Sequence, residues 1–299
     1  MKKNRKKITK AVIAVAGYGT RFLPATKNQP KQMLPIIDKP IIHYLVEEAV
    51  ASGIKEIILV TQAGQHIMED YFDSSFEIEK TLESSGKLDY LKIVQDIPQM
   101  ANFIYVRQKK NLPYGNGTPL LSVKDLINKN EAFLYMFGDD MTISYNKTTV
   151  SKQLINIFQK YSPAAVLGVQ EVPWEEVDKY ASVKYKINPK IPFEMENGLE
   201  KVSKKEAPSN KVQFGRFVFS YDVIKTAENT QTGKGNELWT IDILNNLVKK
   251  GKTVIAQPIE GEWLTTGDPL KYMQAQVKFA LMRKDIGADF KKYLKSLKL

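Results

Sequence analysis

Residues 10–21 read KAVIAVAGYGTR, and this apolar run with two closely spaced glycines decides the fold that we expect. An apolar run that ends in glycine is typical of a central strand in a parallel sheet. Glycine lets the backbone approach a ligand closely, and Arg21, Lys27 and Lys31 follow on a proline-rich loop. Backbone N–H groups beside a guanidinium can bind phosphates, so the sequence predicts an anion-binding loop here.

The glycine pattern GYGTR differs from two better-known phosphate-binding motifs. It lacks the third glycine of the dinucleotide fingerprint and the GK[ST] of a P-loop. Two glycines alone also fit a strand-to-helix turn that needs a positive φ angle. On these residues alone, the ordinary turn stays open as an alternative to a binding loop.

Farther along the chain, strand patterns alternate with helical patterns. Residues 40–51 carry apolar side chains at helical spacing, and the apolar run EIILVT follows at residues 56–61. Further strand patterns lie at residues 133–140, 164–172 and 253–261. This alternation predicts an α/β fold with a mostly parallel sheet flanked by helices. Ligands of such sheets bind beyond the carboxyl ends of the strands, where the glycine loop and Asp139 fall.

We expect one domain over residues 1–299. Residues 174–210 are polar and contain prolines and lysines, which predicts an insertion over the site. Residues 268–284 place Leu270, Met273, Val277 and Leu281 on one helical face, and a shorter helical pattern follows, so C-terminal helices are expected over 268–299.

Composition narrows the class of protein. The net charge of +11 raises nucleic-acid binding as an alternative, but the 44 Lys and Arg are spread among 33 acids without a zinc-finger spacing or an aromatic-basic RNA motif. The chain has no cysteine, which excludes disulfides and fits a reducing compartment. The basic start MKKNRKK precedes an apolar run too short for a secretory signal, and no run of 18 apolar residues occurs. We therefore expect a cytoplasmic protein.

A long opening segment, VAGYGTRFLPATKNQPKQMLPIIDKPIIHYLVEEA, strongly resembles the start of bacterial UTP–glucose-1-phosphate uridylyltransferases. These belong to the sugar nucleotidyltransferases, together with glucose-1-phosphate thymidylyltransferases. The resemblance continues in order through VRQ, GNGTPLL, FGDDM, GVQEVP, LEKV, APSN, GRFVFS, ELWTID and TTGDPLKYM. It implies a Rossmann-like sheet, Mg²⁺-dependent nucleotidyl transfer and assembly into dimers or tetramers.

The resemblance also implies roles for individual residues. The loop containing Ala16, Gly17, Gly19 and Thr20 would contact the base and the phosphates. Arg21 would hold the leaving pyrophosphate, and Lys31 would neutralise the phosphates during transfer. Gln108 resembles the family's base-reading glutamine, with Gly115 as its backbone partner. Asp139 in FGDD matches the magnesium-binding aspartate, and Glu200 with Lys201 matches the pair that binds the sugar hydroxyls and the sugar phosphate.

Several positions depart from the family pattern. Thr265 stands where a second magnesium-binding aspartate is usual, with Asp268 three residues on as an alternative ligand. The other departures are Ala181 for a sugar-proximal glycine, Val202 for proline, Gln32 for glutamate, and Trp239 with Ile241 in ELWTID.

The expected reaction joins UTP and glucose 1-phosphate into UDP-glucose and pyrophosphate. The alternatives are the same chemistry with dTTP or another sugar 1-phosphate, and a weakly active regulatory paralogue, which Thr265 and Ala181 favour.

Overall fold

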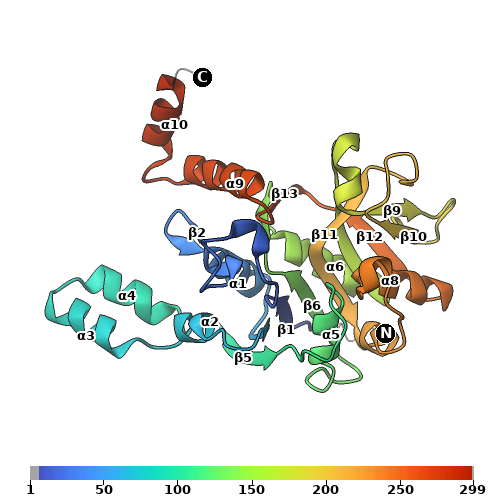
Figure 1. Ribbon diagram of the computed structural model, residues 1–299, viewed down its shortest axis with the longest axis horizontal. Coiled ribbons are helices and arrows are strands. Elements are labelled where there is room, and N and C mark those ends of the chain that lie inside the picture. Colours follow the sequence, from blue (N-terminus) through green and yellow to red (C-terminus); the bar gives the residue numbers. More distant parts are fainter. Residues whose placement is uncertain (1–6, 298–299) are drawn as a thin grey trace.

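The computed structural model describes residues 7–297, so the basic start at residues 1–6 lies outside it. A nine-stranded sheet forms the centre, in the order β10-β9-β11-β6-β1-β4-β5, with β8 and β12 continuing from β11 (Figure 1). Its strands are β1 Lys10–Ala14, β4 Glu56–Thr61, β5 Asn102–Arg107, β6 Ala132–Phe137, β8 Ala165–Glu171, β9 Ala181–Tyr185, β10 Met195–Glu200, β11 Lys211–Ser220 and β12 Val254–Pro258.

The predicted parallel centre is confirmed. Strands β6, β1, β4 and β5 run parallel, and Val12 lies opposite Ile58 on one side and Tyr135 on the other. These residues are fully buried, as expected for strands covered on both faces. The long strand β11 is antiparallel to β6, β8 and β9, so the sheet becomes mixed on that side.

Helices cover both faces of the sheet. Apolar residues of α1 (Ile41–Ala51) and α6 (Val150–Tyr161) pack in one core cluster with Ile13. Residues of α5 (Thr118–Ser122), α7 (Tyr221–Ala227) and α8 (Thr240–Lys249) pack in the other, with Val12. Neighbouring residues of β1 therefore belong to opposite cores, as the pleat of a strand requires.

A buried ion pair links α1 to β11. Arg216 is fully buried, and its Nη2 lies 2.7 Å from Oε2 of Glu48. Ser151 and Thr142 donate their hydroxyl hydrogens to the same carboxylate at 2.6 and 2.9 Å. Burial raises the pKa of Glu48, but Arg216 and the hydroxyl donors outweigh it and hold the pKa below its ordinary value. The pair is thus charged and well hydrogen-bonded.

Residues 174–210 contain a 3-10 helix, η3 Trp174–Lys179, and the antiparallel strands β9 and β10. These strands extend the central sheet through β11, at the right of Figure 1. The segment that we predicted as an insertion therefore includes the edge of the main sheet.

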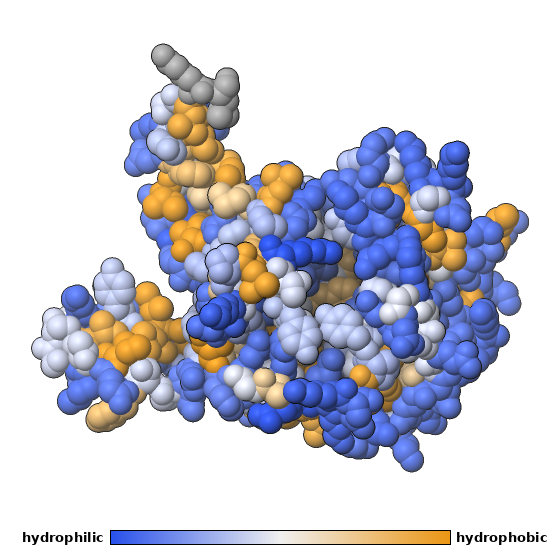
Figure 2. Space-filling view, viewed as in Figure 1, coloured by the Kyte–Doolittle hydropathy of each residue, from blue (hydrophilic) through white to orange (hydrophobic). Residues whose placement is uncertain are grey.

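Two helical arms project from the same side of the body (Figure 1). One follows α2 (Ile67–Tyr71) and is the hairpin of α3 (Phe76–Ser84) and α4 (Leu88–Asp96), which the sequence did not predict. The other is α9 (Pro269–Met282) with α10 (Gly287–Ser296), the predicted C-terminal helices. Both arms expose large apolar side chains, which appear as orange patches in Figure 2; they include Phe76, Leu88, Tyr90, Ile93, Leu270, Met273, Met282 and Tyr293.

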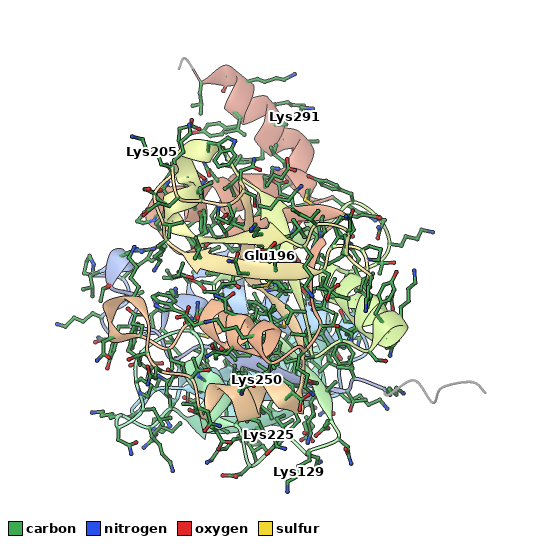
Figure 3. All side chains as sticks on the ribbon, turned by 90° about the vertical axis from the view of Figure 1, so that its right-hand side faces the viewer. Lys129, Glu196, Lys205, Lys225, Lys250 and Lys291 are labelled. Carbon is green, nitrogen blue, oxygen red and sulfur yellow. The ribbon has the colours of Figure 1, made fainter. Side chains whose placement is uncertain are left out.

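No helix within residues 7–297 is both long enough and apolar enough to cross a membrane. On the side shown in Figure 3, the labelled lysines are spread over the whole face, and they include Lys129, Lys205, Lys225, Lys250 and Lys291.

Candidate active site

A cleft of about 460 Å³ opens at the carboxyl ends of β1, β5 and β6, with the ends of β9 and β10 on its far wall. It appears as the hollow in the middle of the face in Figure 2. Of the predicted site residues, the lining contains Ala16, Gly17, Arg21, Lys31, Gln108, Gly115, Asp139, Glu200 and Lys201. Gly19 and Thr20 lie in the same loop but outside the lining. The structure thus brings together residues from both halves of the chain.

The glycine loop is shaped for close approach. A Cβ atom on Gly17 would meet no described atom within 4 Å, so its backbone borders open space. Gly19 has a φ of 63°, and a Cβ there would lie 3.2 Å from Cβ of Lys31. The Thr26 hydroxyl donates to the carbonyl of Gly19 at 2.8 Å, which fixes the loop. Gly19 therefore serves the turn and its contact with Lys31, whereas Gly17 leaves room for a ligand.

Arg21, Lys31 and Asp139 converge at one end of the cleft. Lys31 forms an ion pair with the Asp139 carboxylate, and Arg21 Nη1 donates to the carbonyl of Gly267 at 3.3 Å. A Cβ on Gly267 would lie 3.4 Å from Oδ2 of Asp139 and 3.8 Å from Nη1 of Arg21. Two cations and one carboxylate in so small a space suit a polyphosphate with a divalent cation.

The pairing of β7 (Asp140–Ser144) with β13 (Gly261–Thr265) sets Thr265 beside the FGDD segment. The Thr265 hydroxyl accepts a hydrogen bond from the Gly267 N–H at 3.2 Å. Asp268 caps α9 instead, accepting from the Lys271 N–H at 3.0 Å. Asp268 thus stabilises the start of α9, and it lies outside the cleft lining.

Asp140 differs sharply from its neighbour Asp139. Its side chain is buried and accepts a hydrogen bond from the Gly215 N–H at 2.7 Å. Burial, together with the adjacent Asp139 charge, raises the pKa of Asp140 to about 6. Asp140 therefore joins β7 to β11, while the more exposed Asp139 faces Lys31.

The wall near Gln108 is held by main-chain contacts. The Gln108 N–H donates to the carbonyl of Thr61 at 2.8 Å, which fixes the residue after β5. Gly115 has a φ of 129°, and a Cβ there would lie 2.3 Å from the carbonyl oxygen of Leu238. A side chain at position 115 would push away the segment before α8, so glycine is required for packing as well as for access.

Glu200 and Lys201 lie on the wall at the end of β10. Glu200 Oε2 is buried and has no hydrogen-bond partner among residues 7–297. Burial raises the pKa of Glu200 to about 7, although Lys201, with Nζ 3.9 Å from its Oε1, opposes the rise. Ala181, paired with Glu200 in the sheet, is buried at the same end. An unpaired buried acceptor that lines a cleft is suited to a ligand donor.

Two glutamines share this property, and sequence reasoning did not assign either to the site. Gln32 Oε1 and Gln213 Oε1 are buried without a partner in the described part of the chain, and both residues line the cleft. Gln32 was noted only as a departure from the family pattern. Gln213 lies inside the long strand β11, where sequence alternation alone would place it in the core.

Comparisons with known proteins agree on one family. A family model described as "Nucleotidyl transferase" matches residues 10–280. UTP–glucose-1-phosphate uridylyltransferase YngB of Bacillus subtilis is 39% identical over 98% of this chain and 96% of its own. The enzyme of that type from Staphylococcus epidermidis is 38% identical over 98% and 99%. A UTP-bound UGPase from Acinetobacter baumannii superposes with a TM-score of 0.87 at 33% identity, covering 98% and 100%. A UDP-glucose pyrophosphorylase complexed with UDP-glucose gives 0.82 at 35%, covering 93% and 100%.

Proposed function

Because the chain belongs to the nucleotidyl transferase family, we propose that it makes UDP-glucose and pyrophosphate from UTP and glucose 1-phosphate. The observation that carries this is the convergence of Arg21, Lys31 and Asp139 in one cleft. It occurs in a chain similar over nearly its full length to named uridylyltransferases. Release of pyrophosphate from UTP, but not from dTTP, in the presence of glucose 1-phosphate tests it. Turnover with dTTP or another sugar instead would support the alternatives, and no turnover would support a regulatory paralogue.

The reaction is an in-line displacement. A phosphate oxygen of glucose 1-phosphate attacks the α-phosphorus of UTP, and the bond from that phosphorus to the bridging oxygen breaks as pyrophosphate leaves. The nucleophile is already an anion, so the protein must mainly align two polyanions and neutralise charge. As the family resemblance implies, Lys31 would neutralise the transferred phosphate and Arg21 would hold the leaving pyrophosphate.

The nucleotide would lie along the glycine loop. Ala16 and Gly17, which line the cleft, would border it, and Gly19 and Thr20 belong to the same loop. Gln108 would read the base from its fixed position after β5, opposite the backbone of Gly115.

A divalent cation, Mg²⁺, would be held by Asp139 together with substrate phosphates. The carboxylate of Asp139 and the hydroxyl of Thr265 are hard oxygen donors near one another, which fits a metal that keeps several waters. No group of three His, Cys, Asp or Glu side chains arranged for a metal occurs within residues 7–297. When bound, the ion neutralises phosphate charge.

Thr265→Asp is expected to lower the magnesium concentration for half-maximal activity and to raise turnover. A second carboxylate beside Asp139 would add an anionic ligand where wild type offers a neutral hydroxyl. A magnesium titration of pyrophosphate release measures the change, with Thr265→Asn as the neutral control. Superimposable curves for wild type and Thr265→Asp would show that position 265 does not reach the metal.

Glu200→Gln is expected to raise KM for glucose 1-phosphate far more than KM for UTP, because a carboxylate there accepts sugar hydroxyl hydrogens. Since the pKa of Glu200 is raised to about 7, the carboxylate forms only as pH rises through that value. The wild-type KM for glucose 1-phosphate should therefore fall across this range. The phosphate of glucose 1-phosphate itself titrates near pH 6. Any pH dependence of KM that persists in Glu200→Gln therefore comes from the phosphate and not from Glu200. Equal changes in the two KM values would show that Glu200 has a structural role and does not bind the sugar.

We further propose that the protein is cytoplasmic and forms a homo-oligomer through its two arms, α3–α4 and α9–α10. Both arms expose apolar side chains, and their charges are complementary. Helix α3 carries Glu77, Glu79 and Glu83 against one lysine, whereas α10 carries Lys291, Lys292 and Lys295 against one aspartate. A second copy of the chain therefore fits as the partner, with an arm of one protomer against the other arm of the next. Light scattering gives the molar mass, and a monomer would refute the proposal.

A further inference from the structure

We infer that Trp239 is a positioning residue that holds the Lys201 ammonium for the sugar phosphate, an inference that rests on the proposed function. Trp239 is one of the two residues that depart from the family pattern in ELWTID. The Lys201 Nζ lies 4.3 Å from the centroid of its ring, and both side chains line the cleft. An indole face attracts an ammonium at this distance through the ring quadrupole.

The ring is itself held in place. Trp239 is 8% exposed, and its Nε1 donates to the carbonyl of Lys234 at 2.9 Å. Lys234 in turn donates from Nζ to the carbonyl of Lys201 at 2.6 Å. Trp239, Lys234 and Lys201 thus form a closed set of contacts at the end of β10. An indole fixed in this way can fix the cation above it.

The backbone of Lys201 is also constrained. Its φ is 47°, in the left-handed region that non-glycine residues seldom adopt. Its N–H donates to the carbonyl of Tyr180 at 3.0 Å, which ties Lys201 to the start of β9, the strand that pairs with β10. The long side chain of Lys201 remains 40% exposed, so its direction must come from a side-chain contact.

Glu200 explains why such a contact is needed. Its Oε1 lies 3.9 Å from Nζ of Lys201, beyond a hydrogen bond but close enough to attract the ammonium. Without the indole, the ammonium would move onto this carboxylate, and both groups would be lost to the substrate. The Trp239 ring therefore keeps the cation and the carboxylate apart, so that one can bind the phosphate and the other the sugar hydroxyls.

The test compares Trp239→Leu with Trp239→Phe. Trp239→Leu should raise KM for glucose 1-phosphate about tenfold, as expected for loss of a cation–π contact, with KM for UTP nearly unchanged. Trp239→Phe keeps an aromatic ring face, so its KM for glucose 1-phosphate should lie close to that of the wild type. In a Lys201→Met background, the same Leu substitution should have little further effect. Tyr161→Leu is the matched control, because it removes a cation–π contact with Lys160 outside the cleft and should leave both KM values unchanged.

A second readout does not depend on turnover. In protein labelled at lysine Cε, the ε-methylene protons of Lys201 should be shifted upfield by the ring current and assigned by their loss in Lys201→Arg. The shift should disappear in Trp239→Leu and persist in Trp239→Phe. Absence of the shift in wild type, or a shift without a change in KM for glucose 1-phosphate, overturns the inference. A wild type that forms no UDP-glucose would instead refute the proposed function, while the ring-current shift still decides whether Trp239 holds Lys201.

Discussion

Lys31→Ala and Arg21→Ala should each lower turnover about a hundredfold or more, which is the range for removing one electrostatic stabiliser of a transition state. Both side chains line the cleft, and Lys31 pairs with Asp139, so each lies where the proposed reaction would develop phosphate charge. Folding should be little affected, because neither residue belongs to the buried core. Steady-state release of pyrophosphate measures the loss, and thermal unfolding checks the fold.

Lys27 offers a matched control for the same loop. It is exposed and lies outside the cleft lining, so Lys27→Ala should keep near-normal turnover while removing an equal charge. If Lys27→Ala lost as much activity as Lys31→Ala, general positive charge on the loop would explain the effect. Normal kinetics in both Lys31→Ala and Arg21→Ala would refute the active site proposed here.

Glu48→Ala should lower the free energy of unfolding by about 3–5 kcal/mol, the cost of removing one partner from a buried ion pair. Arg216 is fully buried, and without Glu48 its guanidinium would remain charged in the core. The hydroxyls of Ser151 and Thr142 would lose their acceptor as well. Unfolding in urea, followed by circular dichroism, measures the change.

The neighbouring Glu47 is the control for this prediction. Its side chain is 40% exposed and pairs with Lys39 on the surface, so Glu47→Ala should cost less than about 1 kcal/mol. Equal losses of unfolding free energy in the two variants would show that the buried pair with Arg216 contributes no more to stability than the surface pairing of Glu47. Both residues are glutamates of α1, and they differ in burial and in partners, since Glu47 pairs with Lys39 and His43 at the surface.

The parallel centre of the sheet was predictable because it depends on local pattern. A buried central strand needs a continuous apolar run, and β1, β4 and β6 each contain one. The candidate site residues were predictable only through the resemblance, and Arg21, Lys31, Asp139, Glu200 and Lys201 all line one cleft.

Features that depend on contacts distant in sequence were not predictable. Glu48 and Arg216 are 168 positions apart, and nothing near either residue indicates its partner. Helical spacing predicted the apolar face of α9, but spacing cannot say whether another element covers it, and Leu270 and Met273 are exposed. Prolines and lysines predicted an insertion over the site at residues 174–210, but they did not indicate that β9 and β10 there continue the sheet. The unpaired Oε1 of Gln213 was not predictable either, because Gln213 lies inside β11 and the strand pattern does not indicate the cleft beside it.

The placement of the tryptophans gives the cleft an optical signal of its own. The chain has three, and Trp239 and Trp263 both line the cleft, whereas Trp174 begins η3 outside the lining. Two of the three indoles therefore lie beside the space that the substrates would occupy. A nucleotide or sugar nucleotide that enters should quench or shift this emission without any added dye. Stopped-flow fluorescence can then resolve the order in which the two substrates arrive.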